Sequence, residues 1–262
     1  MNTDNPAYTI RFVNSMEAVD ALAWNALAGP AYPFLRHEFL LALEHTGCTT
    51  AATGWQPVHV LVEERNTTAE HPRLLACLPL YAKTHSMGEY VFDWSWADAY
   101  TRNGLDYYPK LVSAIPFTPC TGPRLLCVAD ADQGRLITDI TRAIKDKAKQ
   151  MQASSWHVLF PDNTQAPLFE AQGLLKRIGC QYQWFNQGYT SFEHYLATFN
   201  SRKRKNLRKE REKVRNAGIS FSVLEGREVT PEQWGDFYRF YASTYLVRGR
   251  NPYLNPDFFK VL

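Results

Sequence analysis

Acidic, aromatic and basic side chains alternate over residues 90–126 in a pattern that suits a substrate-lining loop. The stretch reads YVFDWSWADAYTRNGLDYYPKLVSAIPFTPCTGPRLL. Asp93 and Asp98 could take a proton or hold an ammonium group, and the hydroxyl of Tyr108 could serve as an acid. Outside the stretch, His157 is a candidate general base. A long irregular segment within a compact domain is usually functional or disordered, and this one is too aromatic for disorder. We therefore expect a catalytic or binding loop here.

The other polar and aromatic residues of the loop suggest how a substrate would be held. Large rings are suited to walling a pocket, and the candidates are Trp94, Trp96, Tyr100 and Tyr107. Cationic groups could clamp a carboxylate or phosphate, and the candidates are Arg102, Lys110 and Arg124. Together these residues predict an acceptor pocket.

Each candidate also has an ordinary structural interpretation. The aspartates could be turn or cap residues, and the tryptophans could be core residues. His157 lies within an expected strand and could be a neutral core imidazole. The acids Asp93, Asp98 and Asp106 have no histidine near them in sequence, so we predict no metal site.

The whole excess of positive charge lies in one segment. The net charge of the chain is +3, yet residues 202–215 carry nine Lys or Arg and two Glu. The predicted anion-binding residues are Arg202, Lys203, Arg204, Lys205 and Arg208. Such a patch could hold RNA phosphates, CoA phosphates, a phosphorylated lipid carrier or an anionic membrane surface, or it could be a solvated helix face.

The bulk composition is that of a globular protein. Of the 262 residues, 45% are hydrophobic and 21% charged, and the five cysteines are scattered without a C-x-x-C pair. The first residues lack the basic and apolar regions of a secretory signal, and no apolar run approaches the roughly 20 residues of a membrane span. We therefore expect a cytoplasmic protein with reduced thiols.

Hydrophobic periodicity predicts an α/β fold, with a mixed sheet covered by helices. The expected strands are residues 8–13, 58–63, 74–82, 90–92, 125–128, 156–160 and 182–185. The expected helices are residues 15–27, 34–45, 107–114, 132–152 and 167–178. These elements would make a first domain over residues 1–190.

The remainder of the chain repeats the order strand, helix, helix with which it began. A helix is expected over residues 191–217, a strand over 219–224, and helices over 231–247 and 256–262. We therefore expect a basic helical connection at 191–218 and the start of a second domain at 219–262. The second domain would lack its remaining strands, which predicts a truncated copy.

Several motifs, in order, resemble the bacterial FemAB-like family of predicted N-acyltransferases: FDWSWADAY, GLDYYPKL, PFTPCTGPRLL, SSWHVLFP, SRKRKNLRKERE and TYLVRGRNPYLNPDFF. The resemblance implies tandem GNAT-like domains and transfer of an acyl or aminoacyl group to an amine acceptor in peptidoglycan biosynthesis or recognition. Possible donors are acyl-CoA and aminoacyl-tRNA, with no permanently bound cofactor.

One departure leaves the donor open. The glycine-rich turn by which GNAT enzymes hold the CoA pyrophosphate does not follow Phe92, so either the donor site lies elsewhere or the donor is not CoA. The alternative to an enzyme is a non-catalytic protein that binds cell-wall precursor or nucleic acid through the same loop and basic helix.

Overall fold

The chain forms two compact units, and each is described by itself. In the computed structural model, which describes residues 7–65 and 72–261, the first unit takes Met1–Leu175 together with Pro231–Leu262, and the second takes Lys176–Thr230. This division differs from the expected boundaries at 190 and 218. The segment 231–262, expected in a second domain, belongs to the first unit.

The first unit contains an antiparallel sheet with the strand order β1-β3-β4-β7. Its strands are β1 (Tyr8–Val13), β3 (His59–Glu64), β4 (Leu74–Leu78) and β7 (Leu126–Cys127). The strands expected around residues 60 and 76 are present and pair with each other, with Val62 opposite Ala76.

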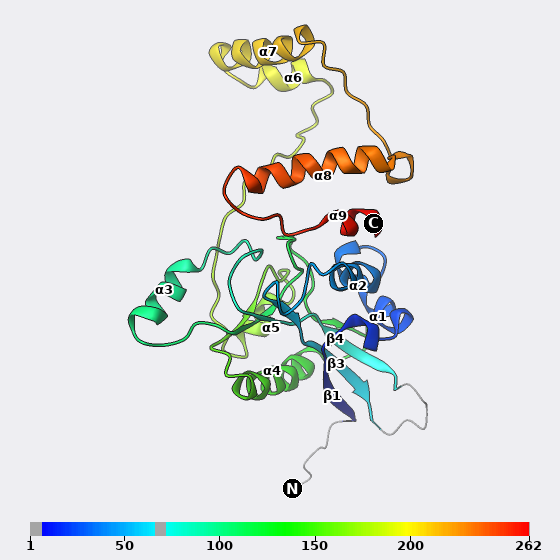
Figure 1. Ribbon diagram of the computed structural model, residues 1–262, viewed down its shortest axis with the longest axis vertical. Coiled ribbons are helices and arrows are strands. Elements are labelled where there is room, and N and C mark those ends of the chain that lie inside the picture. Colours follow the sequence, from blue (N-terminus) through cyan, green and yellow to red (C-terminus); the bar gives the residue numbers. More distant parts are fainter. Residues whose placement is uncertain (1–6, 66–71, 262) are drawn as a thin grey trace. The chain divides into compact units, whose positions relative to one another are not determined.

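Alternation along β3 and β4 explains why both faces of this sheet are covered. Val60, Val62 and Leu78 point to one face, where they pack with the apolar side of α4 (Gln133–Gln150). Leu61 and Cys77 point to the other face, toward α1 (Ala21–Ala28) and α2 (His37–His45). The helices thus lie on opposite sides of the strands (Figure 1).

A second sheet carries the candidate site and has the order β2-β5-β6-β8. Its strands are β2 (Trp55–Pro57), β5 (Tyr81–Lys83), β6 (Lys110–Ser113) and β8 (Trp156–Val158). Pairs β2–β5 and β5–β6 are antiparallel, whereas β6 and β8 run parallel with Val112 opposite His157. This parallel pairing brings two segments about 45 residues apart in sequence side by side.

The remaining helices of the first unit include a packed pair near the end of the chain. They are η1 (Met16–Ala18), η2 (Pro33–Leu35), α3 (Trp94–Arg102), α5 (Ala166–Glu170), α8 (Pro231–Leu246) and α9 (Pro256–Val261). Phe258 and Phe259 of α9 are buried against Leu43 of α2, with Tyr238 of α8 beside them. This aromatic cluster fixes residues 231–262 within the first unit.

The second unit is small and polar. It contains α6 (Phe192–Ala197), α7 (Ser201–Asn216) and η3 (Gly226–Glu228). The continuous helix expected over residues 191–217 is wrong, because Asn200 has an extended backbone and its side chain caps α7 by accepting from the N–H of Lys203. The strands expected at 182–185 and 219–224 are also absent from these described residues.

Two further expectations near the candidate loop are wrong. Residues 90–92 form no strand, since Tyr90 and Phe92 have φ values of 62° and 51°, and α3 begins directly after them. Residues 107–114 form no helix, since Lys110–Ser113 is the wholly buried strand β6. The mixed α/β architecture itself is confirmed.

Candidate active site

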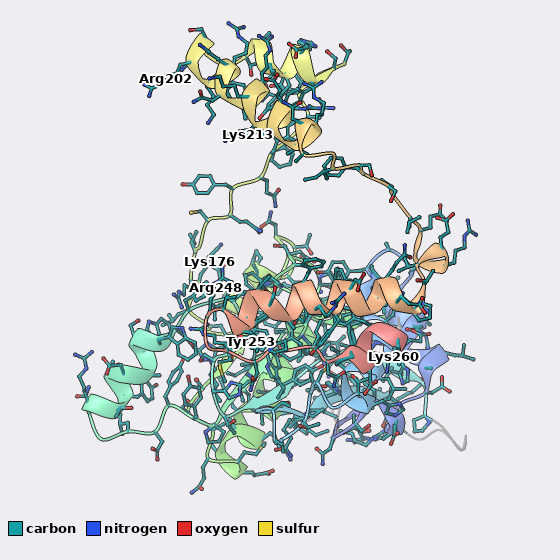
Figure 2. All side chains as sticks on the ribbon, turned by 45° about the horizontal axis from the view of Figure 1, so that its top comes forward. Lys176, Arg202, Lys213, Arg248, Tyr253 and Lys260 are labelled. Carbon is teal, nitrogen blue, oxygen red and sulfur yellow. The ribbon has the colours of Figure 1, made fainter. Side chains whose placement is uncertain are left out.

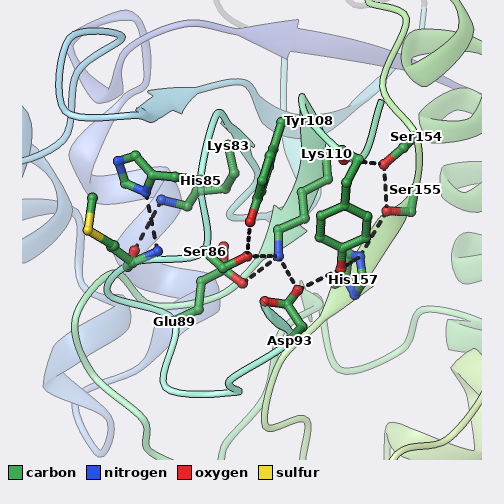
Figure 3. Close-up of polar contacts among 12 residues, drawn as sticks. Lys83, His85, Ser86, Glu89, Asp93, Tyr108, Lys110, Ser154, Ser155 and His157 are labelled. Carbon is green, nitrogen blue, oxygen red and sulfur yellow. Dashed lines mark hydrogen bonds and ion pairs between the residues drawn. The ribbon is translucent and has the colours of Figure 1, made fainter. Parts of the chain in front are cut away.

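A fully buried lysine stands at the centre of the polar cluster on the second sheet. The Nζ of Lys110, on β6, donates to Oγ of Ser86 at 2.8 Å, to Oε2 of Glu89 at 2.8 Å and to Oδ2 of Asp93 at 2.5 Å. Figure 3 shows these three oxygens around the ammonium group. Each N–H of the ammonium has an acceptor, which makes its burial tolerable.

The segment between β5 and α3 supplies all three partners. Asp93 occupies the N-cap position of α3, but its side chain makes no capping hydrogen bond and points to Lys110 instead. Gly88, with φ +81°, lets the segment turn between Ser86 and Glu89. The cluster therefore fixes this irregular segment onto β6.

A hydrogen-bonded chain leads from the buried carboxylate toward β8. The hydroxyl of Tyr107 donates to Oδ2 of Asp93 at 2.6 Å. The hydroxyl oxygen of Tyr107 also lies 3.5 Å from Nε2 of His157. That nitrogen is also 2.9 Å from Oγ of Ser155, whose hydroxyl lies 3.1 Å from that of Ser154. Because His157 is half-buried, the chain runs from the interior to a solvent-accessible imidazole.

Aromatic rings from α3 and from residues 107–108 border this chain. Trp96 lies 6.3 Å from the imidazole of His157, and Tyr100 lies 5.1 Å from Tyr107, between ring centres. Tyr108 contacts Tyr107 at 5.0 Å and shares a 2.8 Å hydrogen bond with Ser86. Trp96 keeps 45% of its surface exposed, so it is accessible to a ligand.

The pKa values of the two buried carboxyl groups are shifted in opposite directions. Burial alone would raise the pKa of Asp93, but hydrogen bonds from Lys110, Ser86 and Tyr107 and the charge of Lys110 lower it to about 2. For Glu89, burial outweighs the attraction of Lys110 and raises the pKa. Asp93 is therefore a firmly ionised partner of Lys110. The pKa of the Tyr107 hydroxyl is raised, first by burial and then by its bond to Asp93.

A second buried lysine, Lys83 on β5, lies beside this cluster. Its Nζ donates to the carbonyl of Met87 at 3.3 Å and lies 3.7 Å from the centre of the Trp55 ring. The ring face favours the charged ammonium. Complete burial acts against it and, with the charge of Lys110, lowers the pKa of Lys83 to about 6 despite the attraction of Glu89. Lys83 is thus predominantly neutral at pH 7.

The structure places the sequence-predicted residues in two groups. One group forms the contiguous cluster just described and consists of Asp93, Trp96, Tyr100, Tyr107, Tyr108, Lys110 and His157. The others lie apart. Asp98 and Arg102 form a 2.9 Å ion pair on the exposed face of α3, and Trp94 is exposed on the same helix.

Arg124 does not fit the role of a substrate clamp. It is fully buried, and its guanidinium donates to the carbonyls of Cys120, Gly122, Pro123 and Leu159 at 2.7–3.1 Å. These bonds hold the proline-rich segment before β7 against β8. We therefore correct the expectation, because no donor of this side chain points to a shared site.

Sequence reasoning missed Ser86, Glu89, Lys83 and Ser155. Glu89 lies only four residues before Asp93, and a second acid next to the candidate loop was an available signal. Ser155 had no signal, because only the parallel pairing of β6 and β8, in which the N–H of Leu111 donates to the carbonyl of Ser155, brings it to the cluster.

The predicted anion-binding residues all lie on α7, where most side chains are exposed. Figure 2 labels Arg202 and Lys213 near the two ends of this helix. Arg208 forms a 2.5 Å ion pair with Glu193 of α6. Their anion-binding role stays a prediction.

A hollow of about 450 Å³ lies beside α6 in the second unit, and another of about 190 Å³ lies beside the start of α4 in the first unit. No group of three or more His, Cys, Asp or Glu in the part of the chain that the structure describes is arranged to hold a metal ion. None of the described helices is both long enough and apolar enough to span a bilayer.

Comparison with known proteins agrees with the family resemblance. The crystal structure of an aminoglycoside antibiotic 6′-N-acetyltransferase from Acinetobacter baumannii is 14% identical, covers 69% of this chain and 99% of its own, and has a TM-score of 0.41, which is too low to support a functional argument. No protein of curated function matches. The sequence pattern of the FemAB-like family, described as peptidoglycan biosynthesis/recognition, matches residues 15–262. The chain therefore belongs to the FemAB-like family.

Proposed function

We propose that the protein is an N-acyltransferase that moves an acyl or aminoacyl group to an amine of a cell-wall precursor, with His157 and Ser155 handling the proton. The observation that supports this most directly is the chain Lys110–Asp93–Tyr107–His157–Ser155, which ends at a half-buried imidazole beside Trp96. Membership of a peptidoglycan biosynthesis/recognition family supports the class of acceptor.

In the proposed reaction the acceptor nitrogen attacks the carbonyl carbon of the donor, and the bond to the leaving group breaks. The attacking amine must lose a proton, and the leaving group must gain one. The hydroxyl of Ser155, 2.9 Å from Nε2 of His157, passes its proton to the imidazole as it takes one from the amine. The imidazolium then returns the proton toward the leaving group.

Asp93 has a positioning role in this scheme and does not act as the proton acceptor, which was one of the two roles that its sequence suggested. A carboxyl group with a pKa of about 2 is a poor proton acceptor near neutral pH. Its acceptor oxygen instead fixes the Tyr107 hydroxyl proton, so that the oxygen of Tyr107 faces Nε2 of His157 as an acceptor. This arrangement stabilises the imidazolium that forms during transfer.

The aromatic side chains of α3 are assigned to the acceptor. Trp96 and Tyr100 flank the chain, and their rings could pack against the apolar faces of a muropeptide. The donor is proposed to be acyl-CoA or aminoacyl-tRNA.

The test measures turnover with named donors and an acceptor. Acetyl-CoA and alanyl-tRNA are each supplied with a muramyl pentapeptide whose third residue carries a free amine, and product is followed by mass spectrometry. Replacing His157→Gln is expected to lower kcat/KM by about 10²- to 10⁴-fold, the usual contribution of a general base. Tyr107→Phe should lower kcat more than it raises KM and should shift the acidic limb of the pH–rate profile.

His45→Gln is the matched control, because His45 is exposed at the end of α2, is ion-paired to Glu17 and is not part of the cluster. Equal activity of His157→Gln and the parent would refute the assigned chemistry. Binding of the pentapeptide without turnover of either donor would favour a recognition protein, the alternative that the family description also allows.

A further inference from the structure

An aromatic hollow of about 450 Å³ lies within the second unit, and neither the fold nor the proposed reaction accounts for it. Its lining consists of Trp184, Asn186, Tyr189, Ser191, Phe192 and Tyr195. Trp184 stacks on Tyr189 at 6.2 Å and meets Tyr195 edge-on at 5.8 Å, measured between ring centres. Trp184 is nevertheless 63% exposed, so the rings present open faces.

Guanidinium groups from α7 adjoin the aromatic side of this hollow. The guanidinium of Arg211 lies 3.9 Å from the ring centre of Phe192, and Arg208 pairs with the neighbouring Glu193 at 2.5 Å. The spacing of 204, 208, 211 and 215 places four arginines on one face of α7. Three of them act electrostatically on Glu193, which locates this row beside α6.

The charge of the second unit is opposite to that of the rest of the chain. Lys176–Thr230 contains twelve Lys or Arg and five Asp or Glu, a net charge of +7. The other residues contain 17 basic and 21 acidic side chains, a net charge of −4. The 16 residues of α7 extend about 24 Å, which exceeds the length of a pyrophosphate and suits a chain of phosphates.

Stacking rings next to a cationic track are the two features by which proteins hold single-stranded nucleic acid. We propose that the second unit binds a single-stranded nucleic-acid segment. One base stacks on Trp184 in the hollow, and the adjacent phosphates lie along the arginine face of α7. The site lies wholly within the second unit, and its test measures RNA binding alone, so a failure of that test would leave the proposed acyl transfer with acyl-CoA as its donor.

The test is fluorescence anisotropy of the full chain with a labelled 12-nucleotide single-stranded RNA. Trp184→Ala should weaken binding about 5- to 150-fold, the range for loss of one stacked base. Trp184→Phe should restore most of the affinity. Tyr182→Ala is the matched control, because this aromatic residue is 96% exposed in the same segment and does not line the hollow.

The cationic half of the site is tested by salt. The logarithm of the association constant should fall linearly with the logarithm of salt concentration, and the paired change Arg208→Gln with Arg211→Gln should reduce that slope by about 1.4, or 0.7 per phosphate contact. The paired change Arg142→Gln with Lys149→Gln, on α4 of the first unit, should leave the slope unchanged.

Several results would overturn the proposal. These are no binding of the RNA at 50 mM salt, equal affinity for a duplex of the same sequence, equal affinity for ATP alone, or equal losses from Trp184→Ala and Tyr182→Ala. Circular dichroism of each variant separates loss of binding from loss of folding. If Trp184→Ala fails to fold, the affinity of the Trp184→Phe variant and the salt slopes of the arginine variants still test the proposal.

Discussion

The two buried lysines of the site meet different surroundings, although only 27 residues separate them. Lys110 has three oxygen partners, two of them carboxylates, whereas Lys83 has one backbone carbonyl and the face of an indole ring. The free-energy cost of burying an ammonium group falls as more hydrogen-bond acceptors replace the water molecules that it loses. The contrast has a measurable consequence for the pH dependence of stability.

The substitution Lys83→Met is expected to make the free energy of unfolding less dependent on pH. The unfolded lysine binds its proton below about pH 10.5 and the folded one only below about 6, so the unfolded state holds more protons between these values. The free energy of unfolding of the parent therefore rises with pH in this window, by up to about 1.4 kcal/mol per unit, and Lys83 contributes no slope below pH 6.

Urea unfolding at pH 6, 7.5 and 9 checks this expectation, with Lys149→Met on the exposed face of α4 as the control. The advantage of Lys83→Met over the parent should shrink as the pH rises. Parallel curves for the parent and Lys83→Met would show that Lys83 keeps its charge in the folded protein.

Residue types in the sequence were enough to identify many members of the cluster as candidates but not to predict the contacts between them. Asp93, Tyr107, Lys110 and His157 were each singled out by their chemistry, and the structure brings them into contact. Their individual roles were not predictable, because the low pKa of Asp93 depends on hydrogen bonds across three segments. A sequence shows which groups can titrate but not which partners surround them.

At the scale of elements, the segment between β5 and α3 depends on one glycine. A Cβ on Gly88 would lie 2.7 Å from the ring of Phe117, and the φ of +81° already disfavours any other residue. The neighbouring Met87 carbonyl accepts from both Lys83 and the indole of Trp55. Displacement of this turn would therefore disturb the whole polar cluster.

We expect Gly88→Ala to lower the free energy of unfolding more than Gly104→Ala. Gly104 has a similar φ of +69°, with no heavy atom within 4 Å of the added Cβ. The Gly104→Ala variant therefore measures the cost of backbone strain alone, about 1 kcal/mol. The clash at Gly88 should add about 1 to 3 kcal/mol. Thermal unfolding of the two variants gives the comparison, and equal losses would mean that the Phe117 ring moves aside freely.

The elements themselves were predictable where local signals agree. Helix α4 was expected within two residues at either end, because Asp132 caps it and its apolar residues have helical spacing. Strand β6 was mistaken for a helix because all four of its residues are buried, and a continuous buried run has no period that separates strand from helix. Helix α3, which buries no residue, was not expected from the sequence.

At the scale of the whole molecule, the first unit is assembled from two separated parts of the chain. Phe258 of α9 is 2% exposed and lies 5.8 Å from Phe39 of α2, measured between ring centres. Replacing Phe258→Ala should cost about 3 to 5 kcal/mol of unfolding free energy, the usual cost of removing a buried phenylalanine. The control Phe221→Ala, 84% exposed in the second unit, should change it by less than about 0.5 kcal/mol.

Denaturant unfolding monitored by tryptophan fluorescence distinguishes the two variants. A negligible effect of Phe258→Ala would mean that residues 231–262 do not stabilise the first unit. That result would return the segment to the separate domain that the sequence suggested.

Because the second unit interrupts the first, the aromatic cluster around α2 cannot close while the nascent chain is short. Leu43 is made 215 residues before Phe258. At ordinary elongation rates this is an interval of roughly 10 to 40 s. During that time the apolar surface around Ala42 and Leu43 of α2 lacks its covering helix, so it is exposed to chaperones that bind unfinished chains.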